Sequence, residues 1–550
     1  MSELVSKLLA RQARMEAARS GFDAIWQDIA ERIIPRKAKF TSGDEQNKTK
    51  GKRQTEKIFD AVPALALDRF AAAVHSLVVP RNQQWHKLKA SVDELNKSVR
   101  VQRYFEDLNG KLFAARYSSN FDNQVHECFY DLGAFATMSL FVGDSGQRIQ
   151  YRSVPTYQTW FAENQFGVVD VMHRKYAMTA RNAVKVFPND RLPEPVKRLA
   201  REKPEHELQF LCVVQPREDR DVSAADFRGM AFVQFDICID HKALVDESGH
   251  RAFPYPVSRY SATPGDIYGR GPAELVLPDV KMLNGMNKTT FQAGQLRVLP
   301  PILAHRDGIL DGVKLTPAAI NYGGVDAQGR QLIQPLQVGA DPAFGLELMD
   351  QKRRVVQDAF WNTLFQILVD NPQMTATEAM LRAQEKGALL APTASRIESE
   401  FLARVIENEL VILDQAGVLP EPPDELIEAG AGYSIDYDSP MSRARRAEEG
   451  IGILRTWEQL APVAQVDPRA YRRFNMDEAA KILAEVNGFP ARAIYSDDEL
   501  AEIKEQEAAQ EQAATLLQAA PVAASAAKDL AQAQAIANAP GGEAPQVVPA

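Results

Sequence analysis

The chain has 550 residues, of which 45% are hydrophobic and 25% charged, and this composition is typical of a folded globular protein of about three to four domains. No run of about 18 apolar residues occurs, so the sequence predicts no membrane-spanning helix. The formal net charge of −9 argues against a protein built to hold nucleic acid tightly, because such binding needs a basic surface.

The first 135 residues predict helices. Residues 1–22 interleave charged residues with leucines, which is typical of an amphipathic helix and not of a secretory signal. Two later stripes repeat apolar residues at steps of three and four, the spacing of one helix face. They comprise Phe59, Val62, Ala66, Phe70, Val74 and Leu77 in the first stripe, and Val125, Phe129, Leu132 and Ala136 in the second. We expect both stripes to pack in a core.

A β module is predicted from Thr137 to about Tyr260. Short runs of β-type residues alternate there with turn residues such as Gly143-Asp144-Ser145-Gly146, as a small sheet or barrel requires. The expected strands are residues 139–142, 149–154, 168–173, 210–214 and 231–239. A helix-rich chain therefore carries one β module inside it.

Two long helices frame a small domain. Residues 266–297 contain the first helix, which follows the turn Tyr268-Gly269-Arg270-Gly271-Pro272 and stops before Pro300-Pro301. Residues 298–341 form short extended runs broken by Asp-Gly and Gly-Gly pairs, and residues 342–368 form the second helix. At 1.5 Å per residue, helices of roughly 25 residues span about 37 Å each. The small domain is thus expected at the far end of a helix pair.

Residues 369–375 interrupt the second helix. Pro372 disfavours helix at Asn371, and a Thr-x-x-Glu capping box at residues 375–378 starts a new helix. Residues 376–436 then form a long kinked helix that ends at Gly417 and a returning segment, and residues 437–520 form further helices. Residues 521–550 are rich in Ala, Gln and Pro, and we expect them to be flexible because they lack the apolar side chains of a core.

The sequence shows no catalytic constellation. It lacks a Walker A pattern, a G-x-S-x-G elbow and a zinc-protease helix, and Gly269-Arg270-Gly271 lacks the third glycine of a dinucleotide site. Cys128, Cys212 and Cys238 are too scattered for a disulfide framework or a Cys-x-x-Cys metal site, and we expect them to be buried. The sequence therefore predicts no catalytic residue, no metal and no cofactor.

Basic residues on the two long helices are candidates for contact with nucleic acid phosphates. The alternative for each residue is ion pairing or a solvated helix face, and taken singly that alternative is favoured. The candidates are Lys281, Lys288 and Arg297 on the first helix and Lys352, Arg353 and Arg354 on the second.

The order and local sequences of these parts resemble the head-to-tail connector, or portal, family of short-tailed double-stranded DNA bacteriophages. The resemblance covers roughly residues 5–500 and is strongest in the segment 253–303, which contains the turn and the first long helix. Further matching segments are residues 26–36, 59–88, 154–161, 167–180, 374–378 and 437–441.

The resemblance implies an α+β, mainly helical portal fold with named domains. Residues 1–265 correspond to the wing, 266–297 and 342–368 to the two stem helices, and 298–341 to the clip. Residues 369–375 correspond to the tunnel loop, 376–436 to a kinked wing helix and its return, and 437–520 to the crown, followed by the tail 521–550. The tunnel loop would present these residues to a DNA channel: Asp370, Asn371, Pro372, Gln373 and Met374.

The same resemblance implies a structural role in the virion. The family forms rings of about twelve identical subunits, assembled in the host cytoplasm and placed at one capsid vertex, through which double-stranded DNA is packaged and ejected. The implied partners are terminase, the major capsid and scaffolding proteins and tail adaptor proteins, with no membrane. Two alternatives stay open from the residues alone: an enzyme of DNA packaging or processing, such as a nuclease, and a non-portal scaffold or tail adaptor. A nuclease would need clustered acidic metal ligands, which the sequence does not show.

Overall fold

The computed structural model divides the chain into two compact units. One unit comprises Met1–Ser91 and Arg103–Arg445, and the other comprises Val92–Gln102 and Arg446–Ala550. The structure describes residues 2–41, 57–81, 83–146, 148–224, 226–298, 302–304, 325, 327–335, 342–362, 391–437, 450, 452–460, 474–476, 479–480, 482–483, 500, 503–504 and 531. Within the second unit, residues 452–460 are helical.

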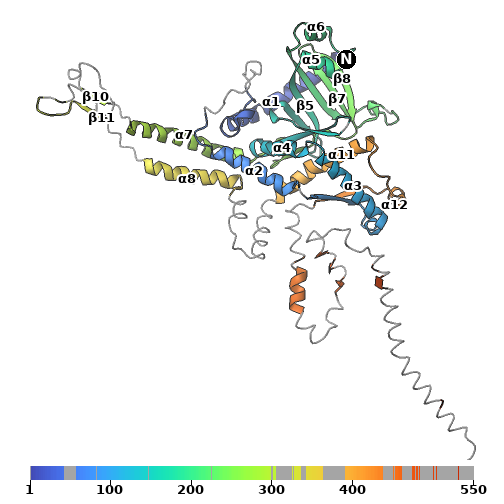
Figure 1. Cartoon of the computed structure of the whole chain (residues 1–550). Helices are drawn as coiled ribbons and strands as arrows, with labels where there is room; N and C mark the ends of the chain where they lie inside the picture. Colours follow the sequence, from blue (N-terminus) through green and yellow to red (C-terminus); the bar gives the residue numbers. More distant parts are fainter. Residues whose placement is uncertain are drawn as a thin grey trace, which may run out of the picture. The chain divides into compact units, whose positions relative to one another are not determined.

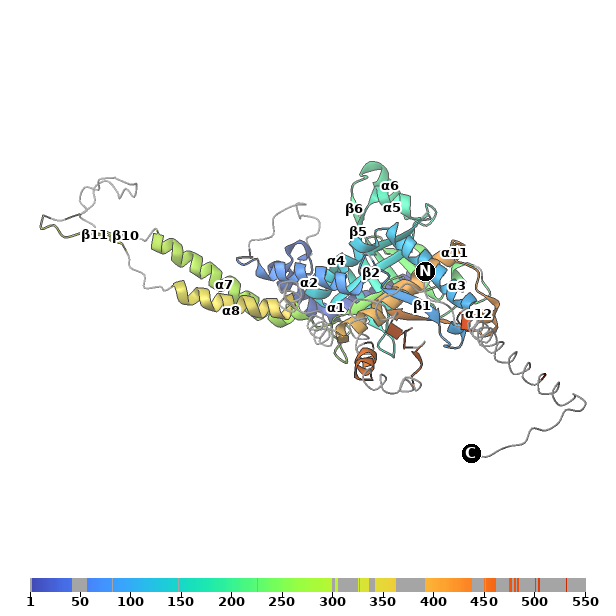
Figure 2. The ribbon, with the colours of Figure 1, turned by 60° about the horizontal axis from the view of Figure 1, so that its bottom comes forward.

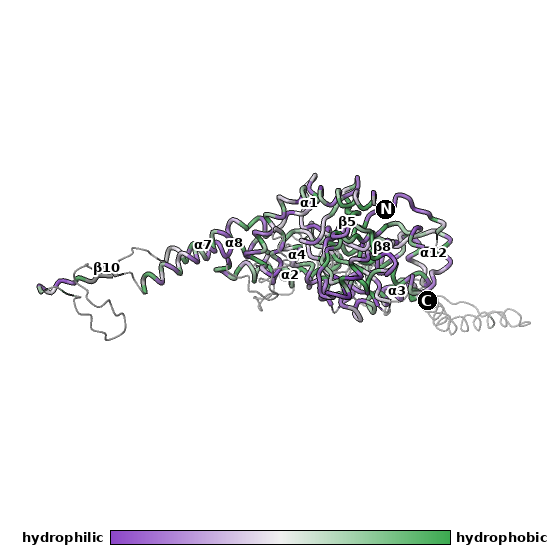
Figure 3. Tube along the Cα trace, turned by 90° about the horizontal axis from the view of Figure 1, so that it is seen from above, coloured by the Kyte–Doolittle hydropathy of each residue, from purple (hydrophilic) through white to green (hydrophobic). Residues whose placement is uncertain are grey.

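Helices from the N-terminal part of the chain surround the core of the first unit (Figure 1). They are α1 (Ser2–Ile33), α2 (Val62–Val78), the part of α3 (Val99–Tyr117) within this unit, and α4 (Phe121–Phe135). Apolar stripes explain the packing, because Phe70 of α2 and Phe129 of α4 are fully buried where these two helices meet. Trp26 of α1 lies in an aromatic cluster with Phe22, Phe40, Phe135 and Tyr268. Figure 3 shows hydrophobic residues concentrated around these helices and the strands.

A five-stranded antiparallel sheet forms most of the β module. Its order is β4 (Thr159–Glu163), β5 (Val169–Thr179), β6 (Glu207–Pro216), β7 (Phe232–Cys238) and β8 (Ala243–His250). Strand alternation gives the sheet two faces. One face packs against Val5 and Leu8 of α1 through Leu211 and Val213 of β6.

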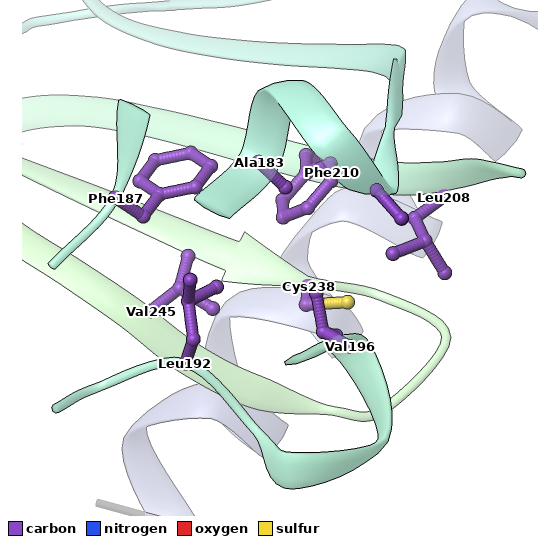
Figure 4. Packing of buried hydrophobic residues seen from close by; sticks show 9 residues of the cluster. Ala183, Phe187, Leu192, Val196, Leu208, Phe210, Cys238 and Val245 are labelled. Atoms are coloured by element: carbon purple, nitrogen blue, oxygen red, sulfur yellow. The ribbon is translucent and has the colours of Figure 1, made fainter. Parts of the chain in front are cut away.

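The opposite face of the sheet carries an inserted helix pair. Helices α5 (Ala180–Val186) and α6 (Glu194–Glu202) lie between β5 and β6 in the sequence. Figure 4 shows the cluster in which Ala183 and Val196 of these helices meet Phe210 and Cys238 of the strands. Helices α5 and α6 therefore cover part of this face of the sheet, and α1 covers the opposite face.

Smaller sheets join distant parts of the first unit. Strand β2 (Thr137–Asp144) lies between β3 (Ile149–Ser153) and β9 (Val257–Arg259), and β1 (His86–Ala90) pairs with β12 (Tyr433–Tyr437). Strands β10 (Ile302–Ala304) and β11 (Ile333–Pro335) form an antiparallel pair. The short 3-10 helices are η1 (Pro35–Lys37), η2 (Leu95–Lys97) in the second unit, η3 (Thr156–Gln158) and η4 (Phe227–Gly229).

The remaining helices include the two long ones predicted from the sequence. They are α7 (Pro272–Val298), α8 (Pro342–Ala359), a π-helix η5 (Ile397–Leu402), α11 (Ala403–Gln415) and α12 (Asp424–Glu428). Gly417 follows α11 with a φ of 65°, as expected for a helix stop that needs the left-handed region. No described helix combines the length and apolarity needed to cross a membrane.

The α+β, mainly helical class is confirmed, and so are the predicted strands of the β module. Several details were wrong. The first 135 residues are not wholly helical, because β1 lies among them, and the module also contains β4, β8, β9, α5 and α6. The first apolar stripe is only partly core, because Phe59 is exposed and precedes α2. The three cysteines are buried, as expected.

The second long helix is interrupted earlier than predicted. Helix α8 ends at Ala359, where Trp361 adopts the left-handed region with a φ of 59°. Residue 362 is helical again, and the rest of the predicted helix, residues 363–368, lies outside the described residues. The rings of Phe360 and Trp361 lie 6.1 and 5.5 Å from that of Phe70, so aromatic packing against α2 accompanies the change of direction.

Candidate functional site

The helix pair α7 and α8 is the candidate functional site, because the family resemblance predicts that these helices form the stem around a DNA channel. The two helices lie side by side and project from the rest of the first unit (Figures 1 and 2). Helix α7 buries Ala273, Val276, Val280 and Leu283, which recur at steps of three and four and face the unit. The opposite side of the helix is left uncovered in the single chain.

A glycine turn fixes the start of α7. The amide of Gly269 donates to Thr137 Oγ1 at 3.0 Å, and the amide of Arg270 donates to the carbonyl of Ser261 at 2.9 Å. A Cβ on Gly271 would lie 2.8 Å from that of Ala136, and one on Gly269 would meet the Ala136 carbonyl oxygen even more closely. The predicted tight turn is therefore confirmed, and its glycines are required by a close approach to the end of α4.

A cluster around Asp60 holds both helices at their base. The Asp60 carboxylate accepts from Arg353 Nε of α8 at 2.9 Å, from Asn287 Nδ2 of α7 at 2.7 Å, and from the amide of Val62 at 2.8 Å. Asn284 Oδ1 accepts from the amide of Asp60 at 3.1 Å. We call Asp60, Asn284, Asn287 and Arg353 the Asp60 cluster. It ties the segment before α2 to both α7 and α8.

Ion pairs engage three of the predicted basic candidates. Lys352 bridges from α8 to Asp279 of α7 at 2.7 Å, and Lys281 of α7 pairs with Asp28 of α1. Partial burial works against the charge of Arg353, but hydrogen bonds to Asp350 and Asp60 outweigh it and raise the pKa of the guanidinium. These side chains thus have carboxylate partners within their own chain.

The other basic candidates differ in their surroundings. Lys288 Nζ lies 5.7 Å from the centre of the Phe59 ring, a cation–π geometry. Arg354 is exposed and makes no ion pair with any residue that the structure describes. The side chain of Arg297 lies outside the described residues. DNA contact by all six residues stays a prediction.

The tunnel-loop residues Asp370, Asn371, Pro372, Gln373 and Met374 lie outside the described residues, as does the capping box at 375–378. The described chain resumes at residue 391, just before the π-helix η5. There the Glu400 carboxylate accepts from the amide of Arg259 at 3.1 Å and from its Nη2 at 2.9 Å. Arg259 therefore anchors η5 to strand β9.

Sequence reasoning missed both of these anchors. Asp60 and Glu400 are single carboxylates without a local motif, and their partners lie 293 and 141 residues away in the chain. Only the segment that contains Phe59-Asp60 was noticed, as part of the family resemblance, and no role was predicted for it. Among the described residues, no group of three or more His, Cys, Asp or Glu side chains is placed to hold a metal ion.

Known proteins similar to this chain are phage head-to-tail connectors. The family model described as bacteriophage head to tail connecting protein matches residues 5–495. A probable portal protein of Bordetella phage BPP-1 is 28% identical over 513 residues, covering 92% of each chain. The portal protein of Salmonella phage epsilon15 is 26% identical over 557 residues, covering 98% of this chain and 99% of the relative.

Two solved structures of gene transfer agent particles also match. A chain of the native virion shares 10% identity with a TM-score of 0.32, covering 73% of this chain and 85% of its own. A chain from the neck of the empty particle, computed with C6 symmetry, shares 10% identity with a TM-score of 0.34, covering 72% and 86%. The family model matches most of the chain, and the two relatives align with it over 92% and 99% of their own length. The chain belongs to the bacteriophage head-to-tail connecting protein family, and its function is that of a portal, a structural part of the virion and not an enzyme.

Proposed function

We propose that the chain assembles into a closed ring of about twelve copies at one capsid vertex, with α7 and α8 around a channel for double-stranded DNA. The observation that carries this proposal is an uncovered apolar stripe on α7. Leu275 and Met282 are 75% and 50% exposed, and Leu296 continues the stripe at a further 14 residues. Residues seven apart lie on one side of a helix, so the stripe suits a second helix packed alongside.

The stripe fits a neighbouring copy of the same chain. A contact between different faces of identical subunits closes into a ring when its rotation closes. Leu346 and Val355 of α8 are also exposed and supply apolar side chains on the other helix of the pair. The ion pairs of Lys281, Lys352 and Arg353 within one chain favour a channel wall that offers DNA few free charges, together with the net charge of −9.

We assign the individual domains from the order in which they follow one another in the portal family. Residues 1–265 and 376–436 form the wing, 437–520 the crown, and 298–341 the clip, which docks terminase during packaging and tail adaptor proteins afterwards. The loop 369–375 forms the narrowest part of the channel, with Asn371 and Gln373 offering uncharged polar groups to moving DNA. Major capsid and scaffolding proteins contact the wing during assembly in the host cytoplasm.

Ring formation is tested by measuring the mass of the purified protein and imaging it by electron microscopy. The wild-type chain should form rings with a central hole and a mass near twelve times 61.0 kDa. Leu275→Glu combined with Met282→Glu should shift the protein to monomers, because charges would have to be buried at the contact.

The control is Val222→Glu, which adds one of these two charges at a residue that is 78% exposed and far from α7 in the sequence. This variant should form rings like the wild type. Monomers of the wild-type chain at high concentration would refute ring assembly, and intact rings of the double variant would show that the stripe does not form the contact.

A further inference from the structure

A cavity of about 470 Å³ lies beside the five-stranded sheet, on the face that also carries α5 and α6. Arg174 of β5, Cys212 of β6 and Asp236 of β7 line it from the sheet, and Arg152 lines it from β3. Its volume lies within the range of small-molecule sites, about 300–1,000 Å³. The portal role assigns nothing to this cavity, which is lined by the β module, by α4 and by Asn120 just before α4.

The strand register keeps the charged groups of the sheet apart. Arg174 pairs with Cys212, and Cys212 pairs with Asp236, so the thiol stands between the two charges. Adjacent strands are about 4.8 Å apart, which separates the two backbones by about 10 Å. Neither Arg174 nor Arg152 has a carboxylate within ion-pair distance among the residues that the structure describes.

Arg174 is therefore a buried cation that forms no ion pair with a carboxylate of the described residues, although the charge of Asp236 acts on it from a longer distance. Its residue is only 7% exposed, and its Nε has no hydrogen-bond partner. The guanidinium makes a long polar contact, from Nη2 to Gln158 Oε1 at 3.5 Å, and lies 4.9 Å from the centre of the Tyr176 ring. Buried charges in proteins are normally paired, because an isolated one is costly.

The other charged groups leave an excess of positive charge in the cavity. Burial and then the charge of Arg174 lower the pKa of Arg152, which shows that the two guanidinium groups repel each other. Burial raises the pKa of Asp236 to about 6, although the hydrogen bond from Gln234 works against this. The cavity is therefore lined by two guanidinium groups, those of Arg174 and Arg152, and by one carboxyl group, that of Asp236, whose pKa is raised.

We propose that this cavity binds a small oxyanion of the phosphate class, free or as a monoester, between Arg174 and Arg152. Guanidinium groups donate paired hydrogen bonds that match the oxygens of such an anion. The side-chain amides of Gln124 and Gln150 also line the cavity and supply further donors. The bound anion would supply the negative charge that Arg174 lacks beside it. It would also reduce the repulsion between the Arg174 and Arg152 guanidinium groups.

The proposal is tested by calorimetric titration of the purified full-length protein with sodium phosphate at pH 7.5, at an ionic strength held constant with sodium chloride. Binding should be saturable, and Arg174→Gln and Arg152→Gln should each raise the Kd at least tenfold. Arg148→Gln is the matched control, because Arg148 lies in the turn between β2 and β3, is exposed and does not line the cavity. It should leave the Kd unchanged.

Arg152 is an exposed residue of β3, so its variant is expected to fold even if Arg174→Gln does not. Titration with ribose 5-phosphate distinguishes the two sources: a Kd lower than that of inorganic phosphate identifies an ester, and an equal or higher one identifies the free ion. No saturable binding of either compound by the wild type, or an unchanged Kd in Arg152→Gln, would overturn the proposal. Ring assembly is measured separately and does not enter this result.

Discussion

A methyl group on Gly269 would fall against the carbonyl oxygen of Ala136, closer than van der Waals contact allows. Ala136 itself adopts the left-handed region with a φ of 56°, a conformation that is held by its surroundings. The backbone at Ala136 therefore cannot easily shift to make room for a side chain at position 269. We predict that Gly269→Ala lowers the free energy of unfolding by at least about 2 kcal/mol, because the start of α7 must shift. The apparent melting temperature of the purified protein measures this effect.

Gly110→Ala is the control for this substitution. Gly110 lies inside α3 with no atom within 4 Å of an added Cβ, so alanine should leave the stability unchanged or raise it by about 0.4–1 kcal/mol through the unfolded chain. Equal melting temperatures for Gly269→Ala and the wild type would contradict the close approach. The sequence predicted the tight turn from its glycines, but not Ala136 as the partner, since nothing local links positions 133 residues apart.

The Asp60 cluster acts on whole elements, because one carboxylate holds α7, α8 and the start of α2. We predict that Asp60→Asn lowers the free energy of unfolding by about 2 kcal/mol, since Arg353 would keep a neutral partner in a buried site. Asp350→Asn is the matched control: it removes the other carboxylate of Arg353, which is 62% exposed, and exposed pairs contribute only about 0–1 kcal/mol. The melting temperatures of the two variants measure this difference. If Asp350→Asn lowers the stability as much as Asp60→Asn does, the Asp60 carboxylate does not hold the helices together more strongly than an exposed ion pair.

Helices and strands with a regular spacing of apolar residues could be predicted from the sequence. Those that depend on partners distant in the sequence could not. The helix of residues 272–298 follows from its apolar spacing and its flanking prolines. Strand β1 was missed because its partner β12 lies about 350 residues later, and five residues reading HKLKA show little that is β-like. The early end of α8 was missed because it depends on aromatic contacts of Trp361 with Phe70 and Tyr260.

The sequence predicted which helices form the candidate site, but it did not predict the contacts between their side chains. Six basic residues were named from their helices, and three of them have acidic partners within the chain that the sequence could not reveal. Family membership, in contrast, was visible because it depends on the order of many segments and not on the surroundings of one residue.

At the scale of the whole molecule, buried histidines make stability depend on pH. Burial, with a smaller contribution from the charge of Arg11, lowers the pKa of His173 to about 3, where Nδ1 lies 3.0 Å from Gln12 Oε1. Burial alone lowers that of His250 to about 4. Between these values and about 6.5, the unfolded chain takes up protons that the folded chain does not, so folding stability falls as the pH falls.

We predict that His173→Gln loses less stability on acidification than the wild type. Each such histidine contributes a slope of about 1.4 kcal/mol per pH unit in that window, and the variant has one fewer. The difference in melting temperature, wild type minus variant, should therefore shrink from pH 7 to pH 5. It should stay constant between pH 7 and 8, where the histidine is neutral in both states. A difference that grows on acidification would refute the burial of a neutral imidazole.

The π-helix η5 has a consequence for the length of the chain. A π turn holds one residue more than an α turn, and here Glu400 within it is held by Arg259. Loss of one residue from an ordinary helix turns every later side chain by about 100° around the axis. Loss of one residue from η5 would instead restore regular α geometry while the neighbouring turns keep their orientation. This segment can therefore absorb a one-residue deletion during the divergence of portal sequences without reorienting α11 against β2, on which it packs.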